Sequence, residues 1–297
     1  MTDQDELEQW KQAGKLAARA LEHGASLITK GASLLEVTDK TEAFILQHGG
    51  KPAFPVQISM NAIAAHYCPE DDDILVFDDQ VVKIDVGVSL NGYIGDNACT
   101  IDLSGRHQGL VDASREALDN AIHLLRPGTT LGEVGKIIQD TISRKGFAPI
   151  RNLSGHGVGV YEFHTAPTIP NIDTHDPTPL TTGQVIAIEP FATTGHGTIV
   201  ETTNASVFSV VLKKPVRNRI TRKVLKHIED TYQALPFTTR WLLTRFNKLE
   251  VTLALRELLL TGVIRGYPPL VERDKGMVSQ AEHTVYIGEE PIVLTRP

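Results

Sequence analysis

Apolar positions recur at helical spacing near the start of the chain. Residues 3–23 carry a stripe that includes Trp10 and Leu21, which predicts an amphipathic helix. The signature Ser-Leu-Leu-Glu at 33–36 predicts the capped start of a second helix, and the glycine pair at 49–50 predicts its end.

The same layout returns later in the chain. Helices are predicted at 110–126 and 130–146, and the second of them again opens on a capping signature. Moving residues 33–49 forward by 97 positions superimposes the cap, the apolar stripe and the glycine stop. These matches predict an internal duplication into two halves, each with two helices and part of a sheet. The same shift brings His66 to within one residue of His164, so we expect both histidines to face one cleft.

A β-hairpin is predicted where apolar β-formers flank the Asn-Gly pair at 91–92. With a two-residue loop, Asp85 faces Ala98. Side chains alternate along a strand, so Asp85 and Asp96 then emerge from one face as diagonal neighbours. Two carboxylates at that spacing repel each other unless a cation lies between them. The alternative is a pair of solvated acids on an exposed face.

Strand character returns in the second half of the chain. The apolar run at 185–188 predicts a buried strand that ends at Glu189, and residues 279–287, which include Glu282, predict another. Between them, residues 221–262 are mostly helical. A helical block between strands of one sheet predicts an insertion.

Composition narrows the class of protein. The chain has 297 residues, 41% hydrophobic and 22% charged, which is typical of one or two globular domains. No apolar run approaches the ~20 residues that a transmembrane helix needs, and the acidic N-terminal segment is unlike a signal peptide. Two cysteines, Cys68 and Cys99, have no paired spacing and fit a reducing compartment. We therefore expect a cytoplasmic protein without membrane contact.

Charge is unevenly distributed. Residues 213–275 hold 14 Lys/Arg and 6 Asp/Glu, a surplus of eight positive charges, in a chain whose net charge is −7. A basic segment on an acidic body favours contact with a polyanion. The alternative is a solvated helical surface of mixed charge.

Five residues form a candidate metal-ligand set. Four of them are carboxylates in or at the end of apolar strand-like runs, where an unpartnered charge is costly. Four carboxylates with one imidazole suit divalent Mn, Fe, Co or Zn, and their number predicts two metal ions close together. The spacings of zinc fingers and EF-hands are absent from the sequence. The set is Asp85, Asp96, His156, Glu189 and Glu282.

These residues lie in motifs that resemble the methionine aminopeptidase family, peptidase M24, over nearly the whole chain. The motifs are Asp85, Asp96, Ala53-Phe54-Pro55, Gly155-His156, Ile188-Glu189-Pro190, Tyr267-Pro268-Pro269-Leu270 and Gln280-Ala281-Glu282-His283-Thr284. The resemblance implies an α+β pita-bread fold with an internal pseudo-two-fold duplication. It also implies a helical, winged-helix-like insertion, which marks type II, in the short form found in archaea. We expect 1–212 and 273–297 to form the catalytic domain and 213–272 the insertion.

The resemblance also implies a role for each metal ligand. Asp85 chelates one ion, Asp96 and Glu282 bridge two ions, and His156 completes the shell of the second ion with Glu189. Glu189 is in addition the candidate for moving the proton of the attacking water.

Four further residues take roles around the substrate by the same resemblance. His164 stabilises the oxyanion at the scissile carbonyl, and His66 contacts the substrate near the leaving nitrogen. Phe54 and Tyr267 line the pocket for the methionine side chain. Without the resemblance, the two aromatic residues would be read as ordinary core residues.

The implied function is removal of the N-terminal methionine from nascent proteins whose second residue is small. The implied partners are nascent polypeptide N-termini and, transiently, ribosomal RNA at the basic insertion, with the enzyme a monomer. One alternative is an Xaa-Pro aminopeptidase or prolidase, which shares the ligands but typically carries a further domain before them, whereas only 84 residues precede Asp85 here. Another is a non-catalytic pita-bread homologue that binds nucleic acid or the ribosome; such homologues typically lose ligands.

Overall fold

Two pairs of helices occupy the positions that the apolar pattern predicts. The computed structural model describes residues 3–202 and 204–296. The helix pairs are α1 (Asp3–Leu27) with α2 (Leu34–Gln47), and α3 (Gln108–Leu124) with α4 (Leu131–Arg144).

The two predicted helix caps differ in the structure. Thr130 forms a complete capping box with Glu133 at the start of α4. At the start of α2, Ser33 accepts a hydrogen bond from the backbone N–H of Glu36, but the Glu36 carboxylate pairs with Lys40 one turn later. The predicted capping box at 33–36 is therefore only half formed, because an ion pair on the helix surface competes for the glutamate.

The predicted hairpin forms with the predicted register. β4 (Val81–Leu90) pairs with β5 (Tyr93–Asp102) so that Asp85 lies opposite Ala98. Asn91 and Gly92 both have positive φ, 55° and 92°, as a tight turn that matches the twist of the strands requires.

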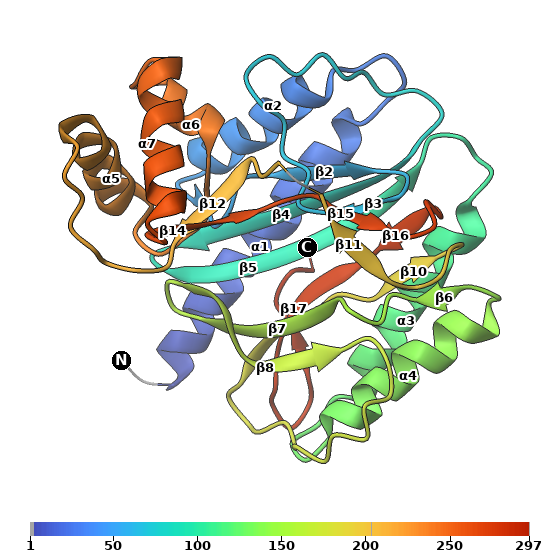
Figure 1. Ribbon diagram of the computed structural model, residues 1–297. Helices are drawn as coiled ribbons and strands as arrows, with labels where there is room; N and C mark the ends of the chain where they lie inside the picture. The colour runs from blue at the N-terminus through green and yellow to red at the C-terminus, as the bar shows by residue number, and fades with distance from the viewer. Residues whose placement is uncertain (1–2, 203, 297) are drawn as a thin grey trace.

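The hairpin belongs to a nine-stranded antiparallel sheet that crosses the molecule (Figure 1). Its strand order is β1-β4-β5-β17-β9-β7-β8, with β2 beside β4 and β18 beside β17. The further strands are β1 (Lys51–Pro52), β2 (Gln57–Met60), β7 (Ser154–Gly159), β8 (Glu162–Pro170), β9 (Val185–Ile188), β17 (Glu282–Tyr286) and β18 (Ile292–Val293).

Two smaller sheets flank it. One has the order β16-β10-β6 and the other β11-β15-β3. Their strands are β3 (Ile63–Ala65), β6 (Ala148–Pro149), β10 (Phe191–Thr193), β11 (Ile199–Glu201), β15 (Leu270–Glu272) and β16 (Val278–Gln280).

The strand predicted at 279–287 is in fact two strands. The backbone N–H of Ala281 donates to the carbonyl of Pro190, so the chain leaves the small sheet after Gln280 and enters the main sheet at Glu282. The uninterrupted prediction was wrong because the break depends on a partner about 90 residues away in the sequence, which local periodicity does not register.

Glu272, the last residue of β15, is fully buried and anchors two loops. Its Oε1 accepts from the backbone N–H of Gly197, and its Oε2 accepts from the backbone N–H groups of Asp274 and Gly276. Burial would raise the pKa of Glu272, but these backbone N–H groups together hold it below its ordinary value.

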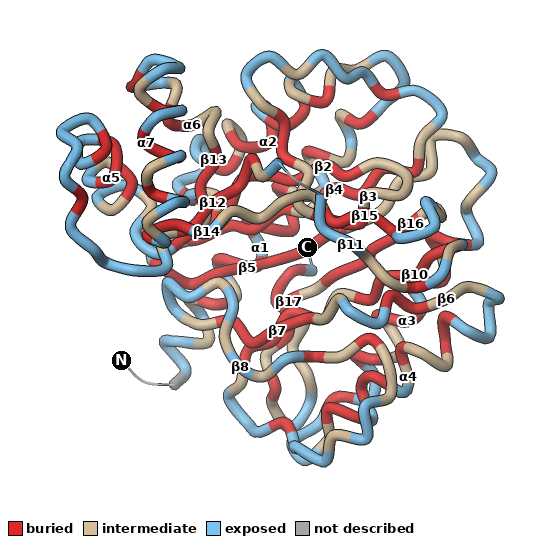
Figure 2. Tube along the Cα trace, viewed as in Figure 1, coloured by how far each residue is buried: buried red, intermediate tan, exposed pale blue. Residues whose placement is uncertain are grey.

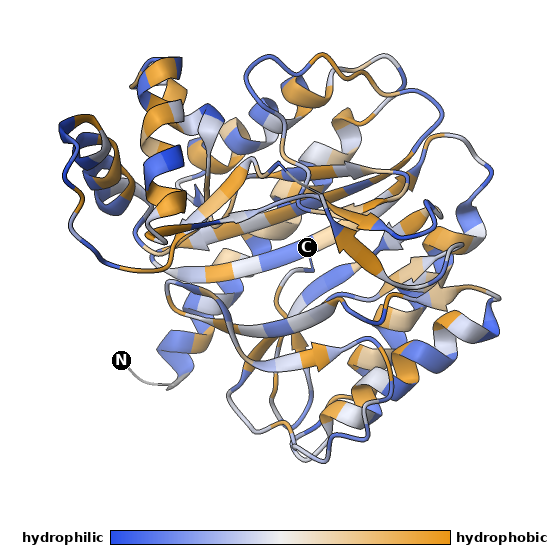
Figure 3. Cartoon of the chain, viewed as in Figure 1, coloured by the Kyte–Doolittle hydropathy of each residue, from blue (hydrophilic) through white to orange (hydrophobic). Residues whose placement is uncertain are grey.

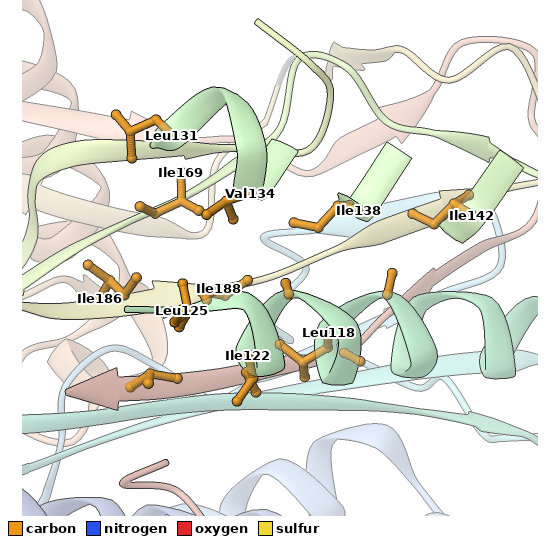
Figure 4. Close-up of a cluster of buried hydrophobic side chains, with 14 of the residues drawn as sticks. Leu118, Ile122, Leu125, Leu131, Val134, Ile138, Ile142, Ile169, Ile186 and Ile188 are labelled. Atoms are coloured by element: carbon orange, nitrogen blue, oxygen red, sulfur yellow. The ribbon is translucent and has the colours of Figure 1, made fainter. Parts of the chain in front are cut away.

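Each helix pair packs on its own hydrophobic core. Residues of α1 and α2 pack with β4 around Leu34, Ile45 and Ile84. Residues of α3 and α4 pack with β8 and β9, with Leu118, Ile138 and Ile186 among them (Figure 4). The strands between these cores are largely buried, and the exposed segments are mostly loops and outer helix faces (Figure 2).

A third helical group has a core of its own at one end of the molecule (Figure 1). It comprises α5 (Arg219–Tyr232), α6 (Thr239–Leu243) and α7 (Lys248–Leu260), with a sheet of order β13-β12-β14. The strands are β12 (Val207–Val210), β13 (Phe237–Thr238) and β14 (Ile264–Tyr267). The insertion was predicted at 213–272, but β12 precedes residue 213 and still pairs with strands of this group. β15 lies within the predicted bounds and pairs instead with β3 and β11 of the body.

One buried ion pair joins this group to the body of the molecule. Arg240 of α6 donates to Glu42 of α2 at 2.8 Å, and the indole N–H of Trp241 donates to the other Glu42 oxygen at 2.8 Å. Across the described parts of the chain, no helix is long and apolar enough to cross a membrane.

Candidate metal centre and active site

Five carboxylate and imidazole side chains converge from neighbouring strands of the main sheet. β4, β5, β17, β9 and β7 are consecutive in the strand order. They carry Asp85, Asp96, Glu282, Glu189 (directly after β9) and His156, respectively. Figure 3 shows hydrophilic positions within β5 and β17, where strands of a buried sheet would ordinarily be apolar.

Ala98 makes room for two of the carboxylates. It pairs with Asp85 on one side and with Glu282 on the other, so the three residues form one row across three strands. Residues directly opposite one another point to the same face of a sheet, and Asp96 joins that face from two positions along β5. The small methyl group of Ala98 therefore does not separate the two carboxylates, and the amide nitrogen of Gln280 reaches both.

The His156 nitrogen that faces the carboxylates carries no hydrogen, so it cannot donate a hydrogen bond to them. Its Nδ1 lies 3.0 Å from the carbonyl oxygen of Gly157; a carbonyl only accepts, so Nδ1 carries the hydrogen. Burial lowers the pKa of His156 to about 4, so the ring is neutral near pH 7 and Nε2 presents a lone pair. That lone pair lies 3.6 Å from Asp96 Oδ2 and 3.8 Å from Glu189 Oε1.

Two oxygens of these carboxylates have no hydrogen-bond donor in the described part of the chain. Asp85 Oδ1 and Asp96 Oδ1 are buried without a hydrogen-bond partner among the described residues. Burial raises the pKa of Asp85 to about 7, and burial together with the neighbouring acids raises the pKa values of Asp96, Glu189 and Glu282 well above their ordinary values. Carboxylate oxygens that face one another in a buried site repel, and a bound divalent cation would remove this repulsion.

The donor atoms are close enough to share an ion. One ligand atom from each of Asp96, His156 and Glu282 lies within 4.8 Å of the other two. Carboxylate oxygens with one imidazole nitrogen fit Mn, Fe, Co or Zn, and the hydrogen bond from Nδ1 orients the imidazole as in known metal sites. The residues present therefore fit a divalent metal centre.

These side chains open onto a cavity of about 350 Å³. Seven of the nine residues singled out in the sequence line it: His66, Asp85, Asp96, His156, His164, Glu189 and Glu282. Phe54 and Tyr267 are not among the lining residues. Phe54 is 1% exposed and lies behind the wall, with its ring centroid 4.6 Å from that of Phe163, which does line the cavity.

His66 is held in an unusual backbone conformation at the cavity edge. Its φ is 66°, and its backbone N–H donates to Gln57 Oε1 at 2.8 Å. Its Nδ1 lies 3.3 Å from the carbonyl oxygen of Pro268, so Nδ1 donates and Nε2 is left as an acceptor. Burial lowers the pKa of His66 to about 4. Tyr267 packs edge-on against this imidazole at 5.9 Å between ring centroids.

His164 lies on β8, beside the metal-site histidine. Its ring centroid is 4.0 Å from that of His156 and 4.1 Å from that of Phe163. His164 is solvent-exposed, whereas His156 is buried, so a substrate entering the cavity can contact His164 directly. The histidine pair expected from the duplication, His66 and His164, does line one cavity.

Several residues in and around the cavity were given no role in the sequence analysis. Gln57 holds the backbone of His66, Phe163 contacts both Phe54 and His164, and the amide of Gln280 reaches two carboxylates. Gln280 was noted only as part of the motif at 280–284, and strand parity with Glu282 indicated that the two side chains share a face.

Comparison with known proteins supports the same assignment. The sequence profile of metallopeptidase family M24 matches residues 8–233. A methionine aminopeptidase from Methanocaldococcus jannaschii is 44% identical over 285 residues, which cover 96% of this chain and 96% of that protein. The crystal structure of a methionine aminopeptidase from Thermotoga maritima superposes with a TM-score of 0.72 at 26% identity, covering 99% of this chain and 97% of that chain.

A prolidase from Pyrococcus furiosus shares the fold, with a TM-score of 0.64 at 22% identity, but this chain spans only 64% of its length. The Methanocaldococcus jannaschii aminopeptidase, by contrast, is matched over 96% of its length. The chain therefore belongs to metallopeptidase family M24 with its α+β pita-bread fold and, within that family, to the archaeal-type (type II) methionine aminopeptidases.

Proposed function

We propose that this chain is a metal-dependent methionyl aminopeptidase that removes the N-terminal methionine of nascent proteins whose second residue is small. The observation that carries the proposal is the convergence of Asp96, His156 and Glu282 on one potential ion position in a cavity that His66 and His164 also line. The 44% identity to an archaeal methionine aminopeptidase, over 96% of both chains, supports protein N-termini as the substrate class.

The metal centre in this proposal has two ions. Asp85 would hold one of them, Asp96 and Glu282 would be shared by both, and His156 and Glu189 would complete the second. Divalent ions bound there would polarise the scissile carbonyl and supply a nucleophile from water at neutral pH. The ligand set accepts Co, Mn, Fe or Zn.

The remaining steps fall to side chains of the cavity. Glu189 takes the proton of the attacking water and passes it to the departing amine, since it is a carboxylate at the edge of the metal centre. His164 stabilises the oxyanion that develops on the scissile carbonyl. The neutral imidazole of His66, with Nε2 available as an acceptor, receives the N–H of the leaving residue.

The methionine side chain would occupy the aromatic end of the cavity. Phe163 forms the wall there, and the Phe54 ring packs behind it in a tilted arrangement, with 4.6 Å between the ring centroids. Tyr267 would influence the pocket indirectly, through His66, on which its ring packs. Its hydroxyl is 2.9 Å from the hydroxyl of Ser209. Thioether and aromatic groups pack favourably, which suits a methionine side chain.

Hydrolysis of Met-Ala-Ser by metal-stripped protein, with each metal restored in turn, tests the activity. Free methionine should appear only with metal, and an Xaa-Pro dipeptide should remain intact. Cleavage of the Xaa-Pro control in place of Met-Ala-Ser would instead favour a prolidase. No cleavage of either substrate, with metal bound, would favour a non-catalytic homologue.

We further propose that the segment predicted at 213–272 is a winged-helix-like insertion in a duplicated catalytic domain predicted at 1–212 and 273–297, with the bounds shifted so that β12 belongs to the insertion and β15 to the catalytic domain. We also propose that this insertion docks transiently on ribosomal RNA. The support is a basic surface that lines a cavity of about 780 Å³ and consists of Lys213, Lys214, Arg222, Lys223 and Lys226. Such docking would place a monomeric, cytoplasmic enzyme near emerging chains.

Ribosome docking requires steep salt dependence, because each phosphate contact releases counterions. Charge reversal by Arg222→Glu with Lys223→Glu should weaken sedimentation with ribosomes, whereas the exposed Lys15→Glu on α1 should not. Binding that is unchanged by salt or by the double reversal would contradict the docking.

A further inference from the structure

Gln280 occupies the point where the chain passes from one sheet to the other. It is the last residue of β16 and lies two positions before the ligand Glu282, with Ala281 between them. The side chain is 1% exposed. A glutamine buried to this extent is uncommon and requires partners for its amide.

The amide nitrogen of Gln280 reaches two proposed ligands at once. Nε2 donates to Glu282 Oε2 at 3.2 Å and to Asp85 Oδ2 at 3.4 Å. An NH₂ group has two hydrogens, so both are engaged by carboxylates from different strands. Asp85 Oδ1, by contrast, is buried without a partner among the described residues. The amide thus engages one oxygen of Asp85 and leaves the other for a cation.

The backbone of Gln280 is fixed independently of its side chain. Its N–H donates to Thr100 Oγ1 at 2.8 Å, and the Thr100 hydroxyl donates back to the Gln280 carbonyl at 2.6 Å. The neighbouring Ser279 donates its hydroxyl to the carbonyl of Leu110 at 2.7 Å. The strand therefore does not need the Gln280 amide to hold its place.

We propose that Gln280 is a positioning residue of the metal centre, which orients the carboxylates of Asp85 and Glu282 for divalent metal. This inference rests on the proposed metal centre. An amide suits the task because it donates without carrying charge, so it does not compete with the cation for the carboxylates. Outer-shell donors of this kind commonly govern the affinity and geometry of a metal site.

Co²⁺ binding tests the role directly, because it has a visible spectrum that reports ligand geometry. Gln280→Met keeps an unbranched side chain of similar length and removes both donors. We expect its Co²⁺ affinity, measured by competition with a chelator, to fall by about 10–100-fold and its visible spectrum to change. Gln280→Leu provides a second donor-free variant, and circular dichroism verifies that each is folded.

Ser279→Ala is the matched control, because it deletes a buried hydrogen bond of the same strand without touching a carboxylate. Its Co²⁺ affinity and spectrum should equal those of the wild type. If the folded Gln280 variants also match the wild type, or if Ser279→Ala loses as much affinity as they do, the positioning role is overturned. Failure of the wild type to bind Co²⁺ would instead contradict the proposed metal centre itself.

Discussion

Replacing Glu272 by glutamine should destabilise the protein strongly, although Glu272 lies outside the cavity. The carboxylate accepts three backbone hydrogen bonds: from Gly197 on Oε1, and from Asp274 and Gly276 on Oε2. An amide can offer an oxygen on one side only, so in either orientation at least one backbone N–H faces an NH₂ group. A charge-assisted bond is worth about 1.5–3 kcal/mol and the remaining bonds weaken without the charge, so we expect a loss of about 2–4 kcal/mol.

The size of this loss should depend on pH. The pKa of Glu272 in the folded protein lies below its ordinary value, so its stabilising contribution is complete above the unfolded pKa of about 4.3 and is lost as the pH falls through the folded value. The glutamine side chain of the variant does not titrate. The difference in free energy of unfolding between wild type and variant should therefore be constant near neutral pH and shrink below about pH 4.

Urea denaturation from pH 7 to pH 3, with a chelator present throughout to keep metal linkage constant, measures this difference. Glu201→Gln is the control, because Glu201 is exposed on β11 of the same small sheet and its replacement should cost less than about 0.5 kcal/mol. A Glu272→Gln variant as stable as the control, or a difference that grows in acid, would refute the reasoning.

Three further substitutions address the site and its surroundings. Glu189→Gln should lower kcat by about 10²–10⁴-fold if Glu189 relays the proton, and near-normal turnover would exclude that role. Gly87→Ala should raise KM for methionyl peptides, because the new Cβ would lie 2.1 Å from Phe54 Cε1 and push that ring toward the cavity wall; an unchanged KM would separate Phe54 from the pocket. Arg240→Ala should cost about 3–5 kcal/mol in urea denaturation, because Glu42 keeps a buried charge without its partner; a loss below about 1 kcal/mol would show that Glu42 is readily neutralised.

The sequence was most informative where structure is local. The Asn-Gly turn determines the register of β4 with β5, and that register places Asp85 and Asp96 on one face, as predicted. Spacing alone gave no ligand roles. Those came from the resemblance, and their assignment to individual ions stays a prediction.

Features that depend on distant partners were not predictable in the same way. The break at Ala281 requires the carbonyl of Pro190, and the orientation of Gln280 requires Asp85 from another strand. The packing of β12 with the helical group depends on pairing with β13 and β14, which its own four residues do not encode. Periodicity describes a segment, whereas these features are properties of pairs of segments.

The passage of the chain into the main sheet at Glu282 has a consequence for biosynthesis. Asp85 and Glu282 lie 197 residues apart in the sequence, yet they belong to one row across three strands. The row cannot form until residue 282 has left the ribosome and β17 has paired with β5 and β9. Contacts of such long sequence separation form late and slowly in folding. The proposed metal centre therefore cannot assemble on a copy of this chain until nearly all of that copy has been synthesised.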